Sequence, residues 1–347
     1  MLTEKEVRRL REELATTQRP IFFFNDDPDG FASFLLLYRM IREGKGFVVK
    51  ATPKLGIQFA QKALEYVADK VFVLDIAIVE QEFIDAVKMP VVWIDHHPPL
   101  LRERVAYFNP KTRGASPTPT SYLCWQVSQK DSWIALAGTI SDWYLPENGL
   151  VSSFRKEYPS LLPKEIKNPE EALFNSPVGV LAKVLSFNLK GSSQDVNTSI
   201  KVFTRLAHPD EILKQESPAG KLIWKKYQQV NQVYESLLRD ALREEKKNKE
   251  EKFLLFSYSK EKISLTKDLA NELAYRFPEK LVIVCREKGD EMKCSFRYSR
   301  GNLLKALETA LVGIEGYGGG HEFACGGVIK SHNFKRFIEN LRAELGV

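Results

Sequence analysis

The chain has 347 residues, of which 44% are hydrophobic and 28% are charged, and its formal net charge is +6. This composition is typical of a globular protein of two or three domains, and the mildly basic charge permits a phosphate-bearing partner without requiring one. No run approaches the length of a membrane span, and the charged N-terminal segment lacks the apolar region of a signal peptide. We therefore expect a cytoplasmic protein that does not contact a membrane.

Helix-like and strand-like segments alternate in the first 150 residues. Residues 3–16 are typical of a charged amphipathic helix with Thr3 as its N-cap. Three short apolar runs follow, at 21–24, 71–74 and 91–94, and each is rich in β-branched or aromatic residues and too short for a helix. Because helix-like stretches separate these runs, they predict a doubly wound parallel sheet.

Residues 151–252 show helical periodicity and few strand signals, so we expect a helical insert and connector between two α/β domains. Apolar side chains in this segment recur at spacings of 4, 3, 4, 3 and 4 residues, the alternation found in coiled coils. Two interpretations stay open, a long helix packed on its own domain and a seam between copies of the chain. The six positions are Ile223, Tyr227, Val230, Tyr234, Leu237 and Ala241.

Strand-like segments return after residue 252, so residues 253–347 predict a smaller C-terminal α/β domain beside the first domain of residues 1–150. Two of these strands would form a hairpin with Gly289 and Asp290 at its tip. Cys285 and Cys294 flank this tip and would face each other, and we expect reduced thiols because the cytoplasm is reducing. The four cysteines form no C-x-x-C pair, so no structural zinc site is expected.

Acidic residues follow each of the three apolar runs. An isolated aspartate after a strand is usually a cap or turn residue, but three such sites, one with two histidines, favour a shared centre. The carboxyl ends of parallel strands lie along one edge of a sheet, so these side chains should converge there. The residues are Asp27 and Asp29 after the first run, Asp75 after the second, and Asp95, His96 and His97 after the third.

Asp142 is a fourth candidate for this centre. In a helix over residues 131–143 it would share a face with Gly138, which would let the helix approach the sheet closely. Crowded carboxylates repel one another unless a cation lies among them. Carboxylate oxygens suit Mg²⁺ and Mn²⁺, and imidazole favours Mn²⁺. Two such ions about 3.5–4 Å apart would support hydrolysis of a phosphoester.

These residues resemble the motifs of the DHH phosphoesterase superfamily. DPDG at 27–30, Asp75, DHH at 95–97 and Asp142 occur in the order of that family, and SFRYS at 295–299 and GGGHEFACGG at 318–327 resemble its companion DHHA1 domain. The resemblance implies a RecJ-like nuclease of the compact archaeal type. It also implies two bound Mn²⁺ ions, for which Mg²⁺ would substitute.

The resemblance implies a role for each matching residue of the N-terminal domain. Asp75 would bridge the two metal ions, and Asp95 would be a ligand or would orient His96. His97 would face the scissile phosphate and act as a catalytic residue together with Asp95. The implied metal ligands are Asp27, Asp29, Asp75, His96 and Asp142.

In the DHHA1 domain, the resemblance implies a contact with the backbone of the substrate. Gly318, Gly319 and Gly320 would present their N–H groups to an anion, because no side chains stand in the way. His321 would add a hydrogen bond, and Arg297 would make a forked contact to phosphate.

Asn25 departs from the pattern of the family, which usually has a histidine two residues before the first aspartate. An amide oxygen is a weaker ligand for Mn²⁺ than imidazole. The residues leave two outcomes open: Asn25 is a ligand of one weakly bound metal, or it only contacts an aspartate.

The resemblance implies an exonuclease that hydrolyses single-stranded DNA or RNA, with a 3′→5′ direction by analogy with archaeal relatives, in DNA repair or replication. Two alternatives stay open. One is a phosphodiesterase for short oligoribonucleotides, cyclic dinucleotides or nucleoside bisphosphates; the other is a scaffold with a decayed active site, which Asn25 would favour. The helical middle would serve a homo-oligomer or a repair or replication-fork helicase as partner.

Overall fold

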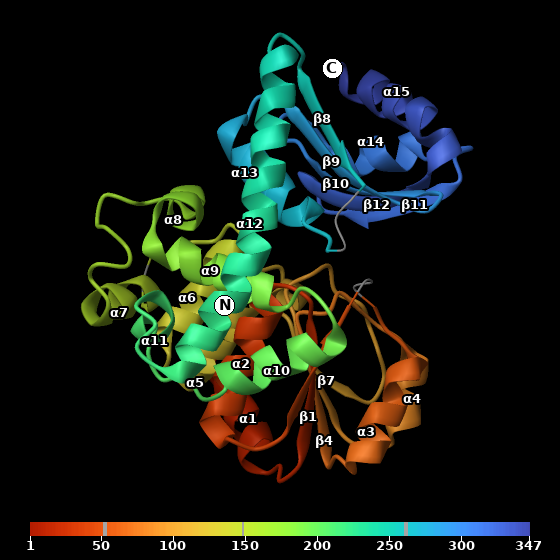
Figure 1. Ribbon diagram of the computed structural model, residues 1–347. Helices are drawn as coiled ribbons and strands as arrows, with labels where there is room; N and C mark the ends of the chain where they lie inside the picture. The colour runs from red at the N-terminus through yellow and green to blue at the C-terminus, as the bar shows by residue number, and fades with distance from the viewer. Residues whose placement is uncertain (51–53, 148, 260–262) are drawn as a thin grey trace. The chain divides into compact units, whose positions relative to one another are not determined.

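The computed structural model describes residues 1–50, 54–147, 149–259 and 263–347 (Figure 1). The chain forms two compact units, Met1–Tyr227 and Gln228–Val347, each with its own sheet. The boundary between the units lies within the long helix α12 (Pro218–Lys247). The division of the chain at residues 150 and 252 stays a prediction.

The first unit is built on a parallel five-stranded sheet of order β2-β1-β4-β6-β7, which confirms the predicted architecture. The three apolar runs are β1, β4 and β6. The two outer strands were not predicted. β7 is as apolar as the inner strands and β2 combines a lysine and a glycine with three apolar residues, yet most residues of both are only half buried because they lie at the edges of the sheet. The strands are β1 (Pro20–Asn25), β2 (Lys45–Val49), β4 (Lys70–Leu74), β6 (Val91–Ile94) and β7 (Val105–Phe108), and β3 (Lys54–Leu55) pairs with β5 (Ile78–Val79) separately.

Helices cover both faces of this sheet because the side chains of each strand alternate between them. Phe22 and Phe24 of β1 pack against Phe34 of α2 (Pro28–Ile41), and Phe23 packs against Phe83 of α4 (Gln81–Val87) on the opposite face. Helix α3 (Ala60–Tyr66) lies beside α4 (Figure 1). Thr3 makes the predicted N-cap, a capping box with Glu6, at the start of α1 (Glu4–Ala15).

Helices follow one another from β7 to the end of the first unit, and those after residue 150 are the ones that the periodicity predicted. Helices α5 and α6 pack on α2, and α9 packs on α6. The remaining elements are α5 (Thr120–Ser128), α6 (Ser132–Ser141), α7 (Leu150–Glu157), α8 (Pro169–Asn175), α9 (Pro177–Asn188), α10 (Ser193–Phe203), α11 (Asp210–Leu213) and the 3-10 turns Ile57–Phe59 and Pro110–Arg113.

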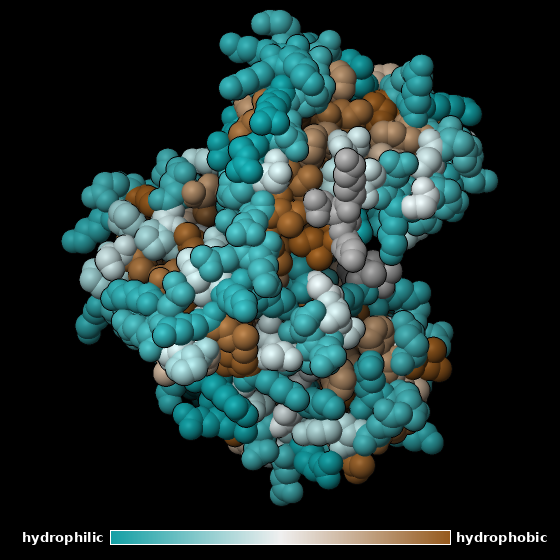
Figure 2. All heavy atoms as spheres, in the orientation of Figure 1, coloured by the Kyte–Doolittle hydropathy of each residue, from teal (hydrophilic) through white to brown (hydrophobic). Residues whose placement is uncertain are grey.

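Helix α12 carries the apolar stripe with the 4, 3, 4, 3, 4 spacing, and all six of its positions are buried. Tyr227 stacks on Phe187 of the first unit, and the Tyr234 hydroxyl donates to Glu272 of the second unit. The face of the helix toward the viewer is mostly hydrophilic (Figure 2), and Leu222 is the helix's exposed large apolar side chain. The interpretation as a helix packed on its own chain is therefore confirmed, and the interpretation of this stripe as a seam between copies is wrong.

The second unit is a mixed five-stranded sheet of order β11-β12-β10-β9-β8, in which β8 and β9 run parallel and the other pairs antiparallel. Helix α13 packs on β9 and β10, and α14 packs on α15. The elements are β8 (Phe253–Tyr258), α13 (Thr266–Arg276), β9 (Leu281–Lys288), β10 (Glu291–Arg297), α14 (Leu303–Ala310), β11 (Gly316–Gly320), β12 (Ala324–Lys330), a 3-10 turn (Ser331–Asn333) and α15 (Phe334–Leu345).

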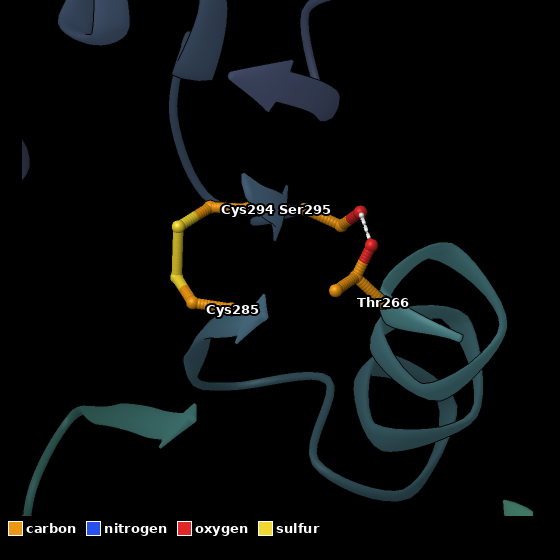
Figure 3. The surroundings of a disulfide bond; sticks show 4 residues. All are labelled: Thr266, Cys285, Cys294 and Ser295. Atoms are coloured by element: carbon orange, nitrogen blue, oxygen red, sulfur yellow. Dashed lines mark hydrogen bonds between the residues drawn. A yellow bond between two sulfur atoms is a disulfide. The ribbon is translucent and has the colours of Figure 1, made fainter. Parts of the chain in front are cut away.

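Cys285 of β9 and Cys294 of β10 form a disulfide, so the expectation of reduced thiols is wrong (Figure 3). The hairpin turns at Gly289 and Asp290 as predicted, and its register places the two cysteines directly opposite each other with their Cα atoms 4.1 Å apart. The next residue, Ser295, points to the other face of the sheet, where its hydroxyl bonds to the Thr266 hydroxyl of α13 at 3.0 Å. The pairing register thus permits a bond that the redox argument had made the less favoured interpretation.

Among the described residues, no helix is both long enough and apolar enough to cross a membrane.

Candidate metal centre

The candidate metal centre lies where β1, β4 and β6 end. All three strands are parallel, and the order of the sheet reverses between β1 and β4, the place where open α/β sheets bind their ligands. Asp27 follows β1, Asp75 follows β4 and Asp95 follows β6, and the three side chains are buried. The predicted convergence at the carboxyl edge follows from this topology.

Asp75 lies at the middle of this edge and has a left-handed backbone conformation, with φ at 58°. A non-glycine residue with this conformation is uncommon, and such strain is often found at functional sites. Its carboxylate accepts a hydrogen bond from the Thr120 hydroxyl at 3.2 Å. Burial and the charge of Asp27 raise the pKa of Asp75 to about 6.

Asp29 joins the first turn of α2 to the start of α5. Its carboxylate accepts backbone N–H bonds from Thr120 at 2.8 Å and Ser121 at 2.9 Å, and a third bond from the Ser121 hydroxyl. Helix α5 has no capping side chain of its own, so Asp29 satisfies its first N–H groups. Burial, and then the charges of Asp75 and Asp142, raise the pKa of Asp29 well above its usual value.

His96 lies between two carboxylates. Its Nε2 atom is 3.3 Å from an oxygen of Asp75 and 3.3 Å from an oxygen of Asp142, which ends helix α6. Burial lowers the pKa of His96, but the hydrogen bond to Asp75 and the charges of Asp142, Asp75 and Asp29 outweigh it and raise that pKa to about 10. The carboxylates around this imidazole therefore favour positive charge at the site.

Two overlapping groups of side chains have the donor set of a metal site. In each group the ligand atoms lie within 4.8 Å of one another, and His96 belongs to both. Carboxylate and imidazole ligands of this kind fit Mn²⁺, and carboxylates alone fit Mg²⁺. The groups are Asp75, His96 and His97, and Asp29, His96 and Asp142.

Asp95 orients His97 and not His96, which corrects the expectation from the sequence. The carboxylate lies 2.7 Å from Nδ1 of His97 and accepts the backbone N–H of the same residue at 3.0 Å. Tyr107 and Asn109 also donate to Asp95, at 3.4 and 3.3 Å. Burial lowers the pKa of His97, but the bond to Asp95 outweighs burial and raises it.

Asn25 uses its amide as a donor to two aspartates. Its Nδ2 atom lies 2.7 Å from a carboxylate oxygen of Asp27 and 3.3 Å from one of Asp75, and its Oδ1 accepts the N–H of Asp26 at 3.0 Å. Asp27 in turn caps α2 by accepting from the N–H of Gly30 at 3.0 Å. In this arrangement Asn25 contacts aspartates, one of the two outcomes that the sequence left open.

Two glycines permit the close approach of backbones around the centre. A Cβ atom on Gly30 would lie 2.8 Å from the backbone of Asn25. One on Gly138 would lie 2.6 Å from Cβ of Ala32 and 2.9 Å from Ser121. Gly138 therefore lets α6 approach helices α2 and α5, whereas the sequence had suggested an approach to the sheet.

The glycine tract of the second unit forms an exposed strand and not a loop. Strand β11 pairs with β12 at the edge of the sheet, so its other side is open to hydrogen bonding. His321 directly follows the strand and is exposed. Arg297 donates to Asn271 Oδ1 at 2.7 Å and to the carbonyl oxygens of Phe296 and Cys325 at 2.7 and 3.3 Å, so its guanidinium is held within its own unit.

Sequence reasoning missed four polar residues of the centre. Asn109 follows strand β7 as the aspartates follow their strands, so recognition of that strand would have found it. Tyr107, two residues earlier and within that strand, points to the same side and accepts a hydrogen bond from Asn109 at 2.7 Å. Thr120 and Ser121 bond to Asp75 and Asp29 from the start of a helix, and no spacing in the sequence indicates that contact.

The sequence signature of the DHH family, N-terminal domain, matches residues 21–142, and that of the DHHA1 domain matches residues 252–346. Together they cover the candidate centre and most of the second unit. The chain therefore belongs to the DHH/DHHA1 superfamily of metal-dependent phosphoesterases. No curated protein sequence matches the chain.

Several solved structures share the fold at low sequence identity. RecJ of Thermus thermophilus in complex with Mn²⁺ is 16% identical with a TM-score of 0.68, over 98% of this chain and 54% of that one. An exonuclease RecJ bound to manganese is 15% identical with a TM-score of 0.63, over 98% and 93%. The DHH domain of a member of a family of ribosomal proteins is 16% identical with a TM-score of 0.67, over 98% and 89%. The chain thus spans about half the length of the Thermus RecJ.

Proposed function

We propose that the protein is a manganese-dependent exonuclease that hydrolyses phosphodiester bonds of single-stranded DNA or RNA, in the 3′→5′ direction. The observation that carries the proposal is the cluster of Asp29, Asp75, His96 and Asp142 at the carboxyl edge of the parallel sheet. The fold shared with RecJ structures that contain manganese supports the choice of metal and of substrate class.

We assign the metal-ligand role to five side chains and leave Asn25 outside the set, because its amide donates to two of them. When bound, two ions supply a nucleophilic water of lowered pKa and stabilise the charge that develops on the phosphate. Mg²⁺ substitutes for Mn²⁺ at these oxygen-rich positions. The five ligands are Asp27, Asp29, Asp75, His96 and Asp142.

His97 is the catalytic residue that we assign to the scissile phosphate. Asp95 holds its Nδ1 atom, which fixes the ring and makes Nε2 the atom that donates a hydrogen bond to substrate. Because Asp95 is bonded from several sides, the ring direction is set before substrate binds.

In the second unit, we assign the open side of Gly318, Gly319 and Gly320 to the phosphate backbone of the substrate, together with His321. Contacts through backbone N–H groups do not depend on base identity, so cleavage should show little sequence preference. Arg297 supports the neighbouring strand β12 through its bond to the Cys325 carbonyl.

The test is incubation of the purified protein with single strands labelled at the 5′ or the 3′ end, with Mn²⁺, with Mg²⁺ and with chelator. We expect a product ladder that shortens from the 3′ end and requires the metal. Cleavage restricted to oligomers of a few nucleotides would favour the phosphodiesterase alternative. No cleavage of any strand with either metal would favour the scaffold and contradict the proposal.

A further inference from the structure

The first unit contains a cavity at the end of its sheet opposite the metal centre. The cavity has a volume of about 1080 Å³, and every residue that lines it belongs to the first unit. It lies between the end of helix α2, the start of strand β2 and helix α10. Six basic side chains line it: Arg39, Arg42, Lys45, Lys130, Lys201 and Arg205. We call this cavity the basic pocket.

The basic pocket is separate from the metal centre. The metal ligands follow the carboxyl ends of the strands, whereas Lys45 begins β2 and pairs with Ile21 at the amino end of β1. Four residues of β2 separate Lys45 from the carboxyl end, which corresponds to about 13 Å. Helix α2 spans a similar distance, since Asp29 lies in its first turn and Arg39 in its last.

Positive charge is concentrated in this pocket. Its lining contains six basic side chains and one acidic side chain, a formal excess of five, while the whole chain carries +6. The single acidic residue, Asp131, is held by Arg39 through two bonds of 2.7 and 2.9 Å. Within the described ranges, no carboxylate forms an ion pair with Arg42, Lys201 or Arg205. A concave site with this charge raises the local concentration of anions.

The ion pair of Arg39 has a structural role, so the other basic side chains of the pocket are the ones that would contact a ligand. Its guanidinium bonds to Asp131 at the start of α6 and to the Leu206 carbonyl after α10, so it ties three segments of the pocket wall together. Arg42, Lys130, Lys201 and Arg205 are exposed around the cavity. The wall is thus fixed and the charged rim is accessible.

Aromatic side chains accompany this charge. Tyr38 and Tyr66 line the pocket, and the ring of Phe34 lies against Gly46, where a Cβ atom would come within 2.6 Å of it. Lys45 lies over the Tyr66 ring, 5.8 Å from its centroid. Cations and ring faces together bind phosphate and base, whereas an acidic peptide requires only the cations.

We propose that the basic pocket binds a nucleotide, with its phosphate on the basic rim and its base against the tyrosines. The volume slightly exceeds the upper end of the range for ligand pockets, about 1000 Å³, so the cavity has room for one nucleotide and its hydration. The nucleotide is either free, as a nucleoside 5′-phosphate, or one unit of a strand that extends beyond the metal centre. Binding of a free nucleotide does not depend on the reaction at the metal centre, whereas binding of a strand rests on the proposed function.

The experiment is calorimetric titration of the full chain in chelator, so that the metal centre is inactive. The probes are adenosine 5′-monophosphate, single-stranded oligothymidylate, inorganic phosphate and hexaglutamate. The double variant Lys201→Glu with Arg205→Glu changes two exposed side chains of the rim. The matched control, Lys221→Glu with Lys225→Glu, makes the same change of charge at exposed positions of α12 outside the pocket.

We expect the pocket variant to weaken nucleotide binding at least about tenfold, because two charge-assisted contacts to phosphate are lost, and the control to bind as the wild type does. Binding of the monophosphate identifies a free nucleotide as ligand, and binding of the oligomer alone identifies a strand. Equal binding by both variants, or inorganic phosphate or hexaglutamate binding as tightly as the nucleotide, would overturn the proposal.

A second measurement keeps the proposal testable if the variant does not fold. Wild-type protein is irradiated with 8-azidoadenosine 5′-monophosphate, and the modified peptides are identified by mass spectrometry. We expect labelling at the end of α2 and near Tyr66. Part of this labelling should persist in the presence of excess inorganic phosphate. Labelling confined to other peptides would overturn the proposal.

Discussion

The metal centre of the first unit and the glycine tract of the second unit present polar groups in opposite ways. At the centre, buried carboxylates are each bonded to several partners, and Asp29 alone accepts three hydrogen bonds. In the tract, an exposed edge strand offers backbone groups with almost no side chains. The first arrangement holds the groups that would bind metal ions, and the second provides a surface for substrate binding. Substitutions at the centre should therefore lower the reaction rate, whereas substitutions in the tract should change stability or substrate binding.

The largest effect is expected from Asp75→Asn. Asparagine keeps the shape of the side chain and tolerates the left-handed backbone, so the change removes charge from the centre without a change of fold. We expect the transition state to lose several kcal/mol of metal-dependent stabilisation, which corresponds to a decrease in cleavage rate of about 1000-fold or more. The rate on a labelled strand and the bound manganese are measured together. Asp240→Asn, at an exposed position of α12, is the control. A rate above a tenth of wild type in the Asp75→Asn variant would contradict the assignment.

Asp95→Asn should have the next largest effect, a decrease of about 10–100-fold in kcat. The amide cannot hold the Nδ1 proton of His97 as the carboxylate does, so the ring loses its fixed direction. A positioning role predicts that KM and manganese affinity change little. Tyr107→Phe, which removes only a 3.4 Å bond to the same carboxylate, is the matched control. A fall in manganese affinity with unchanged kcat would instead make Asp95 a ligand.

Gly318→Ala and Gly319→Ala separate stability from binding in the glycine tract. A Cβ atom at 318 would lie 2.9 Å from Leu307 and 3.0 Å from the Gly326 carbonyl, whereas one at 319 meets nothing within 4 Å. We expect the first change to lower the free energy of unfolding by about 1–3 kcal/mol and the second to leave it within about 0.5 kcal/mol. Urea unfolding measures both.

Gly319→Ala then tests the substrate contact, because its fold should be intact. If this strand lies against the phosphate backbone, the added methyl raises KM for a single strand with little change in kcat. An unchanged KM would remove the tract from the substrate site and sharpen the contrast with the metal centre.

Asn25→His should have a smaller effect on metal dependence. Imidazole is the better ligand for Mn²⁺, so the manganese concentration for half-maximal cleavage should fall severalfold. Asn25→Ala removes the bonds to Asp27 and Asp75 without adding a ligand and serves as the comparison. The same manganese dependence in wild type and the histidine variant would mean that position 25 does not influence the metal.

The last prediction concerns Lys226, which belongs to neither region. Burial lowers its pKa in the folded protein to about 8 from 10.5, while its ammonium donates to the Asn188 carbonyl at 2.7 Å. A lowered pKa destabilises the folded state below pH 8, and this penalty is relieved as pH rises from 8 to 10.5. The free energy of unfolding of the wild type, measured relative to Lys226→Met, should therefore increase over that range. Measured relative to the control Lys225→Met, at an exposed position, it should not increase.

Much of the centre could be predicted from the sequence, because the position of a residue after a buried parallel strand depends on local pattern alone. Asp27, Asp75 and His96 were found in this way. The partner of Asp95 could not be found, since His96 and His97 are adjacent in sequence and only the backbone path after β6 decides which ring reaches it. The edge strands β2 and β7 were missed although both contain a short apolar run, since such a run alone does not distinguish a strand from another buried segment.

The amino-acid sequence by itself determined the alternation of helices with the three inner strands, the family and the acidic and histidine residues that gather at the carboxyl edge, because these depend on periodicity and on the topology of parallel sheets. Only the tertiary structure decided the disulfide of Cys285 and Cys294, the burial of the stripe on α12 and the basic pocket. Each of these depends on which surfaces meet and in which register, and residues far apart in the chain contribute to that outcome together.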